Sequence, residues 1–190
     1  MLARQRSNNK SEAVWRPFSP RVHRDIPGPQ LSWLLDPASL TKRLIATCPG
    51  CFQVEVVDER WAKPFRSERK ALGIRQNILA RVRQVRLLCD GVPWVFARTV
   101  IPYSTLKGPV RRLSMLGTRP LGAVLFADPT MQRGRLEIAG IRPGDYLYQR
   151  ATRELRKKAE IIWGRRSVFY LSGKPLLVNE IFLPGIDGKI

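Results

Sequence analysis

Hydrophobic positions form two long strand-like stretches in this chain, and each stretch is broken by a glycine-proline turn. Ile78 to Cys89 and Trp94 to Ile101 flank the first turn, and Val168 to Leu171 and Leu176 to Leu183 flank the second. Apolar runs on both sides of a glycine-bearing turn are typical of β-hairpins. The pattern therefore predicts two hairpins with long strands.

Shorter elements are expected around these hairpins. Leucines at helical spacing predict two short helices, at Leu31 to Leu35 and at Leu40 to Ile45, which we expect to form a lid or a flank of the fold. Trp61 to Gly73 is polar and is expected to be irregular. The other predicted elements are a strand at Phe52 to Val56, helices at Pro109 to Leu116 and Pro120 to Phe126, a strand at Arg135 to Ala139, and a helix, or a helix running into a strand, at Ala151 to Ile162. The fold class is therefore α+β, with an antiparallel sheet.

The length of 190 residues fits one domain. Residues 1–28 are basic and lack periodicity, so we expect a disordered tail there and a folded domain over residues 29–190. There is no apolar run of the ~20 residues that a membrane span requires, and the first 28 residues lack the apolar stretch of a secretory signal. We therefore expect a soluble, cytoplasmic monomer without a membrane span.

Three cysteines cannot staple a chain of this size, and disulfides are not expected in a reducing compartment. Cys48-Pro-Gly-Cys51 has the spacing of a redox motif or of half a zinc site. No second pair accompanies it, and His23 is the only histidine of the sequence. We therefore predict neither a metal site nor a redox role for this motif.

The formal net charge is +19, from 34 Lys and Arg against 15 Asp and Glu. Such a charge suits a nucleic-acid-binding protein, but a solvated basic tail and one solvated helix face would give the same number. It would also attract a small anionic substrate. Much of the excess lies in the tail and in a second segment that holds Arg150, Arg153, Arg156, Lys157 and Lys158.

The two predicted hairpins match each other position by position. When Gly91-Val92-Pro93 is laid on Gly173-Lys174-Pro175, Arg98 falls on Glu180. These two residues, and Arg83 before the first turn, are charges within runs that otherwise alternate like buried strands. An unpaired ion in such surroundings costs several kcal/mol. Either an arginine pairs with Glu180 in a buried salt bridge, or the surplus positive charge binds an anionic ligand.

Several stretches of the chain, in order, resemble the signature stretches of bacterial chorismate pyruvate-lyases. The resemblance runs from about Leu31 to Pro184, although Ile141 to Ile162 is longer than the family pattern. It implies an antiparallel sheet whose helical flaps enclose a buried ligand pocket, and conversion of chorismate to 4-hydroxybenzoate and pyruvate for ubiquinone biosynthesis, without metal or cofactor. The stretches are Leu87 to Trp94, Arg98 to Pro102, Pro120 to Gly122, Trp163 to Ser167 and Leu171 to Leu177.

The resemblance also implies roles for individual residues. Arg83 would clamp the ring carboxylate in two-pronged fashion, and the backbone N–H of Leu121 would reach the same group. Glu180 and the backbone of Leu40 would hold the ring hydroxyl. We expect Arg98 to steady the enolpyruvyl carboxylate or its departing oxygen. From the residue type alone, Leu40 and Leu121 would be ordinary core residues.

Two other functions fit parts of the pattern. The effector-binding domains of some bacterial transcription regulators resemble this fold and carry a similar Asp-Gly-x-Pro hairpin, but the tail is too short for a DNA-binding module. A nucleic-acid-binding protein would need surface aromatics among its basic residues. Because Trp61, Trp94 and Trp163 lie in or beside apolar strand-like runs, we do not expect a nucleic-acid partner.

Overall fold

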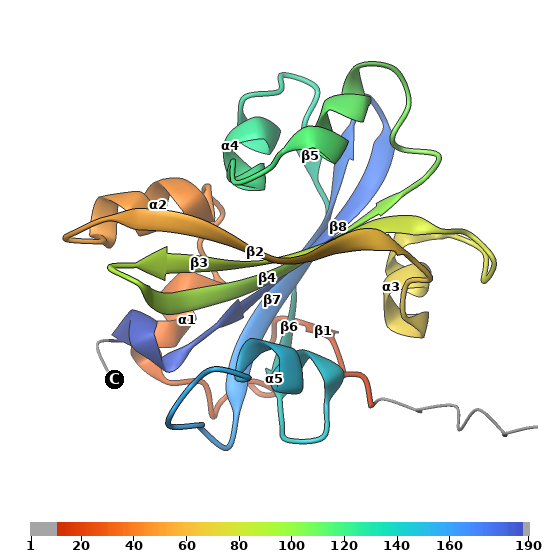
Figure 1. The fold of residues 1–190 in the computed structure, drawn as a ribbon. Helices are drawn as coiled ribbons and strands as arrows, with labels where there is room; N and C mark the ends of the chain where they lie inside the picture. The colour runs from red at the N-terminus through yellow and green to blue at the C-terminus, as the bar shows by residue number, and fades with distance from the viewer. Residues whose placement is uncertain (1–10, 188–190) are drawn as a thin grey trace, which may run out of the picture.

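The computed structural model describes residues 11–187, and within them one twisted antiparallel sheet forms the centre of the molecule (Figure 1). Its strand order is β1-β6-β7-β8-β4-β3-β2, and β5 pairs with β7. This confirms the predicted α+β class. The strands are β1 (Arg16–Pro17), β2 (Phe52–Ala62), β3 (Ala80–Cys89), β4 (Val92–Pro102), β5 (Gln132–Arg133), β6 (Glu137–Ile141), β7 (Ile162–Leu171) and β8 (Lys174–Phe182).

Both predicted hairpins are present, and together they supply the four long central strands of the sheet. Asp90 and Gly91 at the β3–β4 turn have φ of 48° and 76°, and Ser172 and Gly173 at the β7–β8 turn have 48° and 72°. Two consecutive positive φ angles are typical of the two-residue hairpin turn whose twist matches that of the strands. The hairpins pair with each other through β4 and β8.

One residue distinguishes the two hairpins. Between β3 and β4 the register passes from Leu87 opposite Val95 to Leu88 opposite Pro93, so that Trp94 is an extra residue in β4. The β7–β8 register runs without a break. A bulge of this kind reverses which face of the sheet every later side chain of the strand points to.

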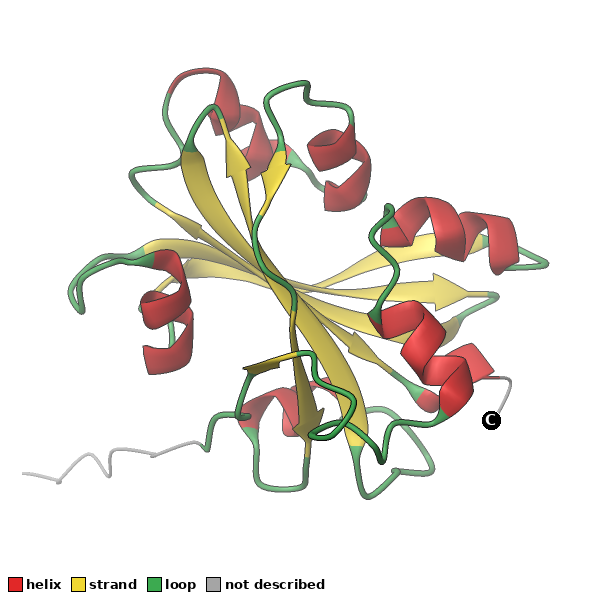
Figure 2. Cartoon of the chain, turned by 180° about the vertical axis from the view of Figure 1, so that it is seen from behind, coloured by secondary structure: helices red, strands yellow, loops and turns green. Residues whose placement is uncertain are grey.

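Helices cover both faces of the sheet (Figures 1 and 2). One face packs against α1, α2, η1 and α4, whereas the other packs against α3 and α5. None of the described helices is long and apolar enough to cross a membrane. The helices are α1 (Gly28–Leu34), α2 (Leu40–Thr47), α3 (Arg66–Leu72), the 3-10 helix η1 (Gly108–Met115), α4 (Leu121–Phe126), α5 (Tyr146–Ala151) and the 3-10 helix η2 (Pro184–Asp187).

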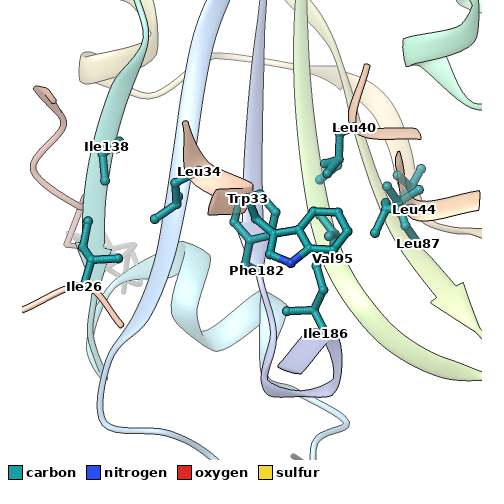
Figure 3. Packing of buried hydrophobic residues seen from close by; sticks show 12 residues of the cluster. Ile26, Trp33, Leu34, Leu40, Leu44, Leu87, Val95, Ile138, Phe182 and Ile186 are labelled. Carbon is teal, nitrogen blue, oxygen red and sulfur yellow. The ribbon is translucent and has the colours of Figure 1, made fainter. Parts of the chain in front are cut away.

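A hydrophobic cluster fixes the lid helices α1 and α2 on the first face (Figure 3). Leu34 and Leu44 are fully buried. The ring of Trp33 packs against the ring of Phe182 in β8, with 6.4 Å between the two ring centroids. Burying a leucine or phenylalanine side chain stabilises a fold by about 1.5–3 kcal/mol. The predicted lid therefore forms, and it is held against the sheet by the leucines whose spacing predicted it.

The end of α2 is tied to the first hairpin in a way that we did not expect. Cys48, which follows α2, forms a disulfide with Cys89 of β3, and Cys51 is free and exposed. The carboxylate of Asp90 also accepts a hydrogen bond from the Cys51 N–H at 2.7 Å. The prediction of no disulfide is wrong, because the hairpin turn brings Cys89 beside a cysteine that is distant in sequence.

Two segments differ from their predicted structure. Residues 66–72 form helix α3 inside the segment expected to be irregular, and Trp61 at the end of β2 is 44% exposed. A helix, or a helix running into a strand, was predicted at residues 151–162, but α5 ends at Ala151 and turns follow until β7 begins at Ile162. Leu155 and Ala159 of this loop pack against the cluster that contains α5.

Part of the expected tail belongs to the fold. Among residues 11–27, β1 pairs with β6, Ala13 is buried, and the Glu12 carboxylate accepts hydrogen bonds from the N–H groups of Arg66 and Ser67 at 3.0 and 2.9 Å. Residues 1–10 lie outside the described residues. The fold therefore begins before the predicted boundary at residue 28.

Candidate active site

A pocket lies between the first face of the sheet and the lid, bounded by α2 and α4. Arg83, Glu180, Leu40 and Leu121, the four residues that we expected to contact a ligand, all line it. They come from four different elements, so the fold brings them together from across the sequence.

Arg83 of β3 is 2% exposed and anchors one part of the pocket. Its Nη2 donates to the carbonyl of Gly117 at 2.6 Å, and its Nε lies 3.6 Å from Glu59 Oε2. That Nε is buried and has no hydrogen-bond acceptor among the described residues. Burial lowers the pKa of Arg83, and the Glu59 carboxylate opposes this shift. Arg83 also lines the pocket, where its guanidinium group could bind a carboxylate.

Glu180 of β8 forms an ion pair with Arg165, which lies opposite it in β7. Arg165 Nε donates to Glu180 Oε2 at 2.6 Å, and the guanidinium is only 1% exposed. Arg165 Nη1 also donates to the carbonyls of Trp33 and Asp36, at 2.9 and 2.6 Å. The same arginine therefore orients the pocket carboxylate and holds the loop between α1 and α2.

Arg133, in the short strand β5, adds a third guanidinium to the pocket. Its Nε donates to Ser167 Oγ at 3.2 Å, and its Nη1 donates to the Pro37 carbonyl at 3.0 Å. Burial lowers the pKa of Arg133, and the charge of Arg165 lowers it further, whereas Glu180 and Asp36 oppose the shift. With three guanidinium groups and one carboxylate, these pocket residues are complementary to an anion.

Leu40 and Leu121 each stand at the first position of a helix. Leu121 follows Pro120 at the start of α4, and Leu40 follows the cap residue Ser39 at the start of α2. Backbone N–H groups at these positions have no partner inside the helix, so they can donate to a ligand. A Cβ on Gly122 would meet Thr41 Oγ1 at 2.8 Å, so glycine lets the two helix starts approach closely.

Arg98 is not part of this pocket, and the expectation that it shares a site with Glu180 is wrong. It lies opposite Asn179, whereas Glu180 lies opposite Ala97. The bulge at Trp94 is the reason, because it turns Arg98 toward the second face of the sheet. There Arg98 forms a two-pronged buried ion pair with Glu68 of α3, at 2.7 and 3.0 Å. Neither arginine considered for a salt bridge with Glu180 makes one.

Two charged residues of the pocket, Arg165 and Arg133, were not predicted from the sequence. A signal existed for Arg165, since it alternates with Ser167 and Phe169 along β7 and lies in a stretch that resembles the family. Arg133 had no such signal, because the two-residue strand β5 is too short to show a period.

Comparison with solved structures relates this fold to bacterial regulators. A GntR-family transcriptional regulator from Bacillus cereus is similar with a TM-score of 0.53 and 15% identity, over 70% of this chain and 92% of that one. The ligand-binding domain of a putative GntR-family regulator from Bordetella bronchiseptica gives 0.51 and 12%, over 70% and 85%. At this identity the likeness concerns the fold alone.

Sequence comparison is more specific. A probable chorismate pyruvate-lyase of Aromatoleum aromaticum is 43% identical over 90% of this chain and 91% of its own length. A protein of the same name from Methylococcus capsulatus is 42% identical over 82% of this chain and 94% of its own. The family described as chorismate lyase matches residues 10–189. The chain therefore belongs to the chorismate lyase family.

Proposed function

We propose that this protein is a chorismate pyruvate-lyase that converts chorismate to 4-hydroxybenzoate and pyruvate. One observation carries the proposal beyond family membership. The residues expected to contact the ligand line a single pocket in which arginines outnumber the one glutamate. Chorismate carries two carboxylates and a ring hydroxyl, so an anion-binding pocket with one hydrogen-bond-accepting carboxylate suits it.

The reaction needs no external oxidant or reductant. The ether C–O bond to the ring breaks, and its electron pair leaves with the oxygen as the enolate of pyruvate. The ring carbon that bears the hydroxyl loses a proton, and the electron pair of that C–H bond completes the aromatic ring. The enolate takes up a proton at its CH₂ group. Aromatisation drives the reaction, so the protein mainly has to orient the substrate and move protons.

Arg83 and Leu121 would hold the ring carboxylate. Arg83 lines the pocket, and its guanidinium and the first N–H of α4 are both donors that suit an anion. Because the carbonyl of Gly117 already occupies Nη2, the guanidinium is fixed before the substrate arrives. Such preorganised donors cost little reorganisation when the ligand binds.

Glu180 would grip the ring hydroxyl and accept the proton lost from the same ring carbon. Arg165 occupies Oε2 of this carboxylate, which leaves Oε1 for the substrate. The backbone of Leu40 would contact the hydroxyl from the lid. General-base assistance by a positioned carboxylate typically contributes ~10²–10⁴-fold to a rate.

A direct assay tests the proposal. Purified protein is incubated with chorismate, and pyruvate and 4-hydroxybenzoate are measured together. We expect equal amounts of both, a sharp loss of rate in Arg83→Ala and Glu180→Ala, and little change in Arg135→Gln, which alters an exposed arginine. Binding of 4-hydroxybenzoate without any turnover of chorismate would instead indicate an effector-binding protein.

The cellular setting belongs to the same proposal. We expect the 4-hydroxybenzoate to enter ubiquinone biosynthesis, and the protein to act in the cytoplasm as a monomer. Size-exclusion chromatography coupled to light scattering tests the oligomeric state, where a mass near twice the 21.7 kDa of the chain would contradict a monomer.

A further inference from the structure

Arg133 is a pocket arginine without a counter-charge. No carboxylate of the described residues lies within 4.0 Å of its guanidinium, whereas Arg165 pairs with Glu180 and Arg83 lies near Glu59. Its hydrogen-bond acceptors are neutral: the hydroxyl of Ser167 and two backbone carbonyls. Arg133 is therefore a cation that the protein partly buries but does not neutralise.

Leaving a partly buried charge unpaired is unfavourable, and two causes add up here. Desolvation disfavours the charged form, and the neighbouring guanidinium of Arg165 repels it. An anion bound beside Arg133 would relieve both costs. An anionic ligand would therefore be stabilised more by Arg133 than by an arginine that is fully exposed to solvent.

The guanidinium of Arg133 is held in place before any ligand binds. Nε is fixed by Ser167 of β7, and Nη1 by the carbonyls of the loop that precedes α2. The guanidinium carbon lies 5.4 Å from the ring centroid of Phe169, which also lines the pocket. Nη2 has no acceptor among the residues that the structure describes. One donor group of a fixed cation is therefore available to a ligand.

The pocket contains two candidate cations for the second carboxylate of the substrate. Arg83 is assigned to the ring carboxylate, and Arg98 is on the other face of the sheet. Arg165 is 1% exposed, its Nε donates to Glu180, and its Nη1 donates to lid carbonyls. Arg133 is the pocket arginine that has both exposure and an unused donor.

We propose that Arg133 binds the enolpyruvyl carboxylate of chorismate and thereby distinguishes the dianionic substrate from its monoanionic aromatic product. This inference rests on the proposed function and deepens it. The enolpyruvyl carboxylate leaves with pyruvate, so 4-hydroxybenzoate alone has no group for Arg133. Arg133 accordingly contributes to substrate binding and to the departure of the enolate, but not to product affinity.

The experiment compares two ligands that differ in this carboxylate. For Arg133→Gln we expect kcat/KM for chorismate to fall on the order of 10- to 100-fold, the usual effect of losing a charged hydrogen bond. Affinity for 4-hydroxybenzoate, measured by calorimetry, should stay within about twofold. Arg83→Gln should weaken both ligands, because both carry the ring carboxylate. Arg133→Lys, which keeps the charge, should recover part of the loss.

Two controls separate the possible failures. Arg135→Gln removes the same unit of charge from an exposed neighbour, so it reports any loss due to long-range attraction alone. The thermal midpoint of each variant shows whether the lid loop that Arg133 holds has loosened. Suppose that the wild type is active. If Arg133→Gln weakens the binding of chorismate and of 4-hydroxybenzoate equally, or leaves kcat/KM for chorismate unchanged, the proposal fails while the proposed function stands. If the wild type does not turn over chorismate, both fail.

Discussion

Arg165 Nε lies 2.6 Å from Glu180 Oε2, and the two residues face each other across neighbouring strands. Because the arginine is buried and also grips the lid carbonyls, the carboxylate has one oxygen committed and one left for a ligand. The acid that would handle the ring hydroxyl and the lid that encloses it are therefore positioned by the same side chain.

The variant Glu180→Gln removes the negative charge of this side chain with little change in its shape, so it tests the role of the charge. We expect Glu180→Gln to lower kcat for chorismate on the order of 10²–10³-fold, because the amide cannot act as a base. The amide can still accept a hydrogen bond, so affinity for 4-hydroxybenzoate should fall much less. Initial rates of pyruvate release and calorimetric titration measure the two effects. A well-folded Glu180→Gln variant with full activity would refute the role.

Arg98 should matter for stability and not for chemistry. Removing one partner of its buried ion pair leaves the other charge uncompensated, which typically costs about 3–5 kcal/mol. We expect Arg98→Met and Glu68→Leu each to lower the free energy of unfolding by this order, and the double variant to recover much of the loss. Urea unfolding provides the measurement.

The variants of Arg98 and Glu68 should differ from variants of the pocket residues in their activity. The rate per folded molecule of the Arg98→Met, Glu68→Leu double variant should stay within a few-fold of wild type, because neither side chain lines the pocket. A fall of a hundredfold in a fully folded double variant would instead indicate a catalytic role for Arg98.

The Cys48–Cys89 bond should contribute measurably to stability. It closes a separation of 41 residues, and cross-links of this kind typically stabilise a fold by about 2–4 kcal/mol. We expect a reducing agent to lower the thermal midpoint of wild type and to have little effect on Cys48→Ser. Cys51→Ser is the matched control, since it keeps the bond and should still respond to reductant. Finding three reactive thiols in the unreduced, unfolded chain would contradict the pairing.

Asp36 makes the lid sensitive to acid. Burial opposes its ionisation, but the N–H of Ala38, the ion pair with Arg43 and the charge of Arg165 outweigh this and hold the pKa of Asp36 below its usual value. A carboxyl group whose pKa is lower in the folded state contributes stability above its unfolded pKa of ~3.9, and loses it as the pH falls through the folded pKa.

The variant Asp36→Asn checks this direction. It should be less stable than wild type near pH 6, and the difference should shrink as the pH is lowered below about 4, where the unfolded carboxyl starts to be protonated. Urea unfolding of both proteins between pH 3 and pH 6 gives the comparison. A stability difference that grows toward acid would contradict the assignment.

The sequence predicted much of this architecture because its signals are local. Alternation and turn residues were sufficient for the hairpins, and leucine spacing was sufficient for the lid. Alternation within each strand also placed Arg83 and Glu180 on apolar faces, and the family resemblance predicted that they share a pocket. Such signals depend only on neighbours along the chain, which is why they survive without any tertiary information.

The predictions that were wrong or incomplete all concern contacts between segments that are distant in the sequence. Alternation predicts the face of a side chain only along an unbroken strand. The extra residue Trp94 interrupts the alternation in β4, so Arg98 points to the face of the sheet opposite the pocket. The Cys48–Cys89 bond and the packing of Leu155 depend on where the sheet brings remote residues. Arg133 lies in the pocket because β5 pairs with β7. A strand of two residues shows no alternation in the sequence, so this pairing could not be predicted.

The lid helix α2 is attached to the rest of the fold at both of its ends. The disulfide between Cys48 and Cys89 ties its C-terminal end to β3. The eight residues of α2 span about 12 Å, and Leu40 stands at the other end. The loop before Leu40 is held by its backbone carbonyls, which accept hydrogen bonds from Arg133 and Arg165. The arginines that line the pocket therefore also fix the N-terminal end of the lid helix, so a substitution that changes the charge of the pocket also changes the support of its cover.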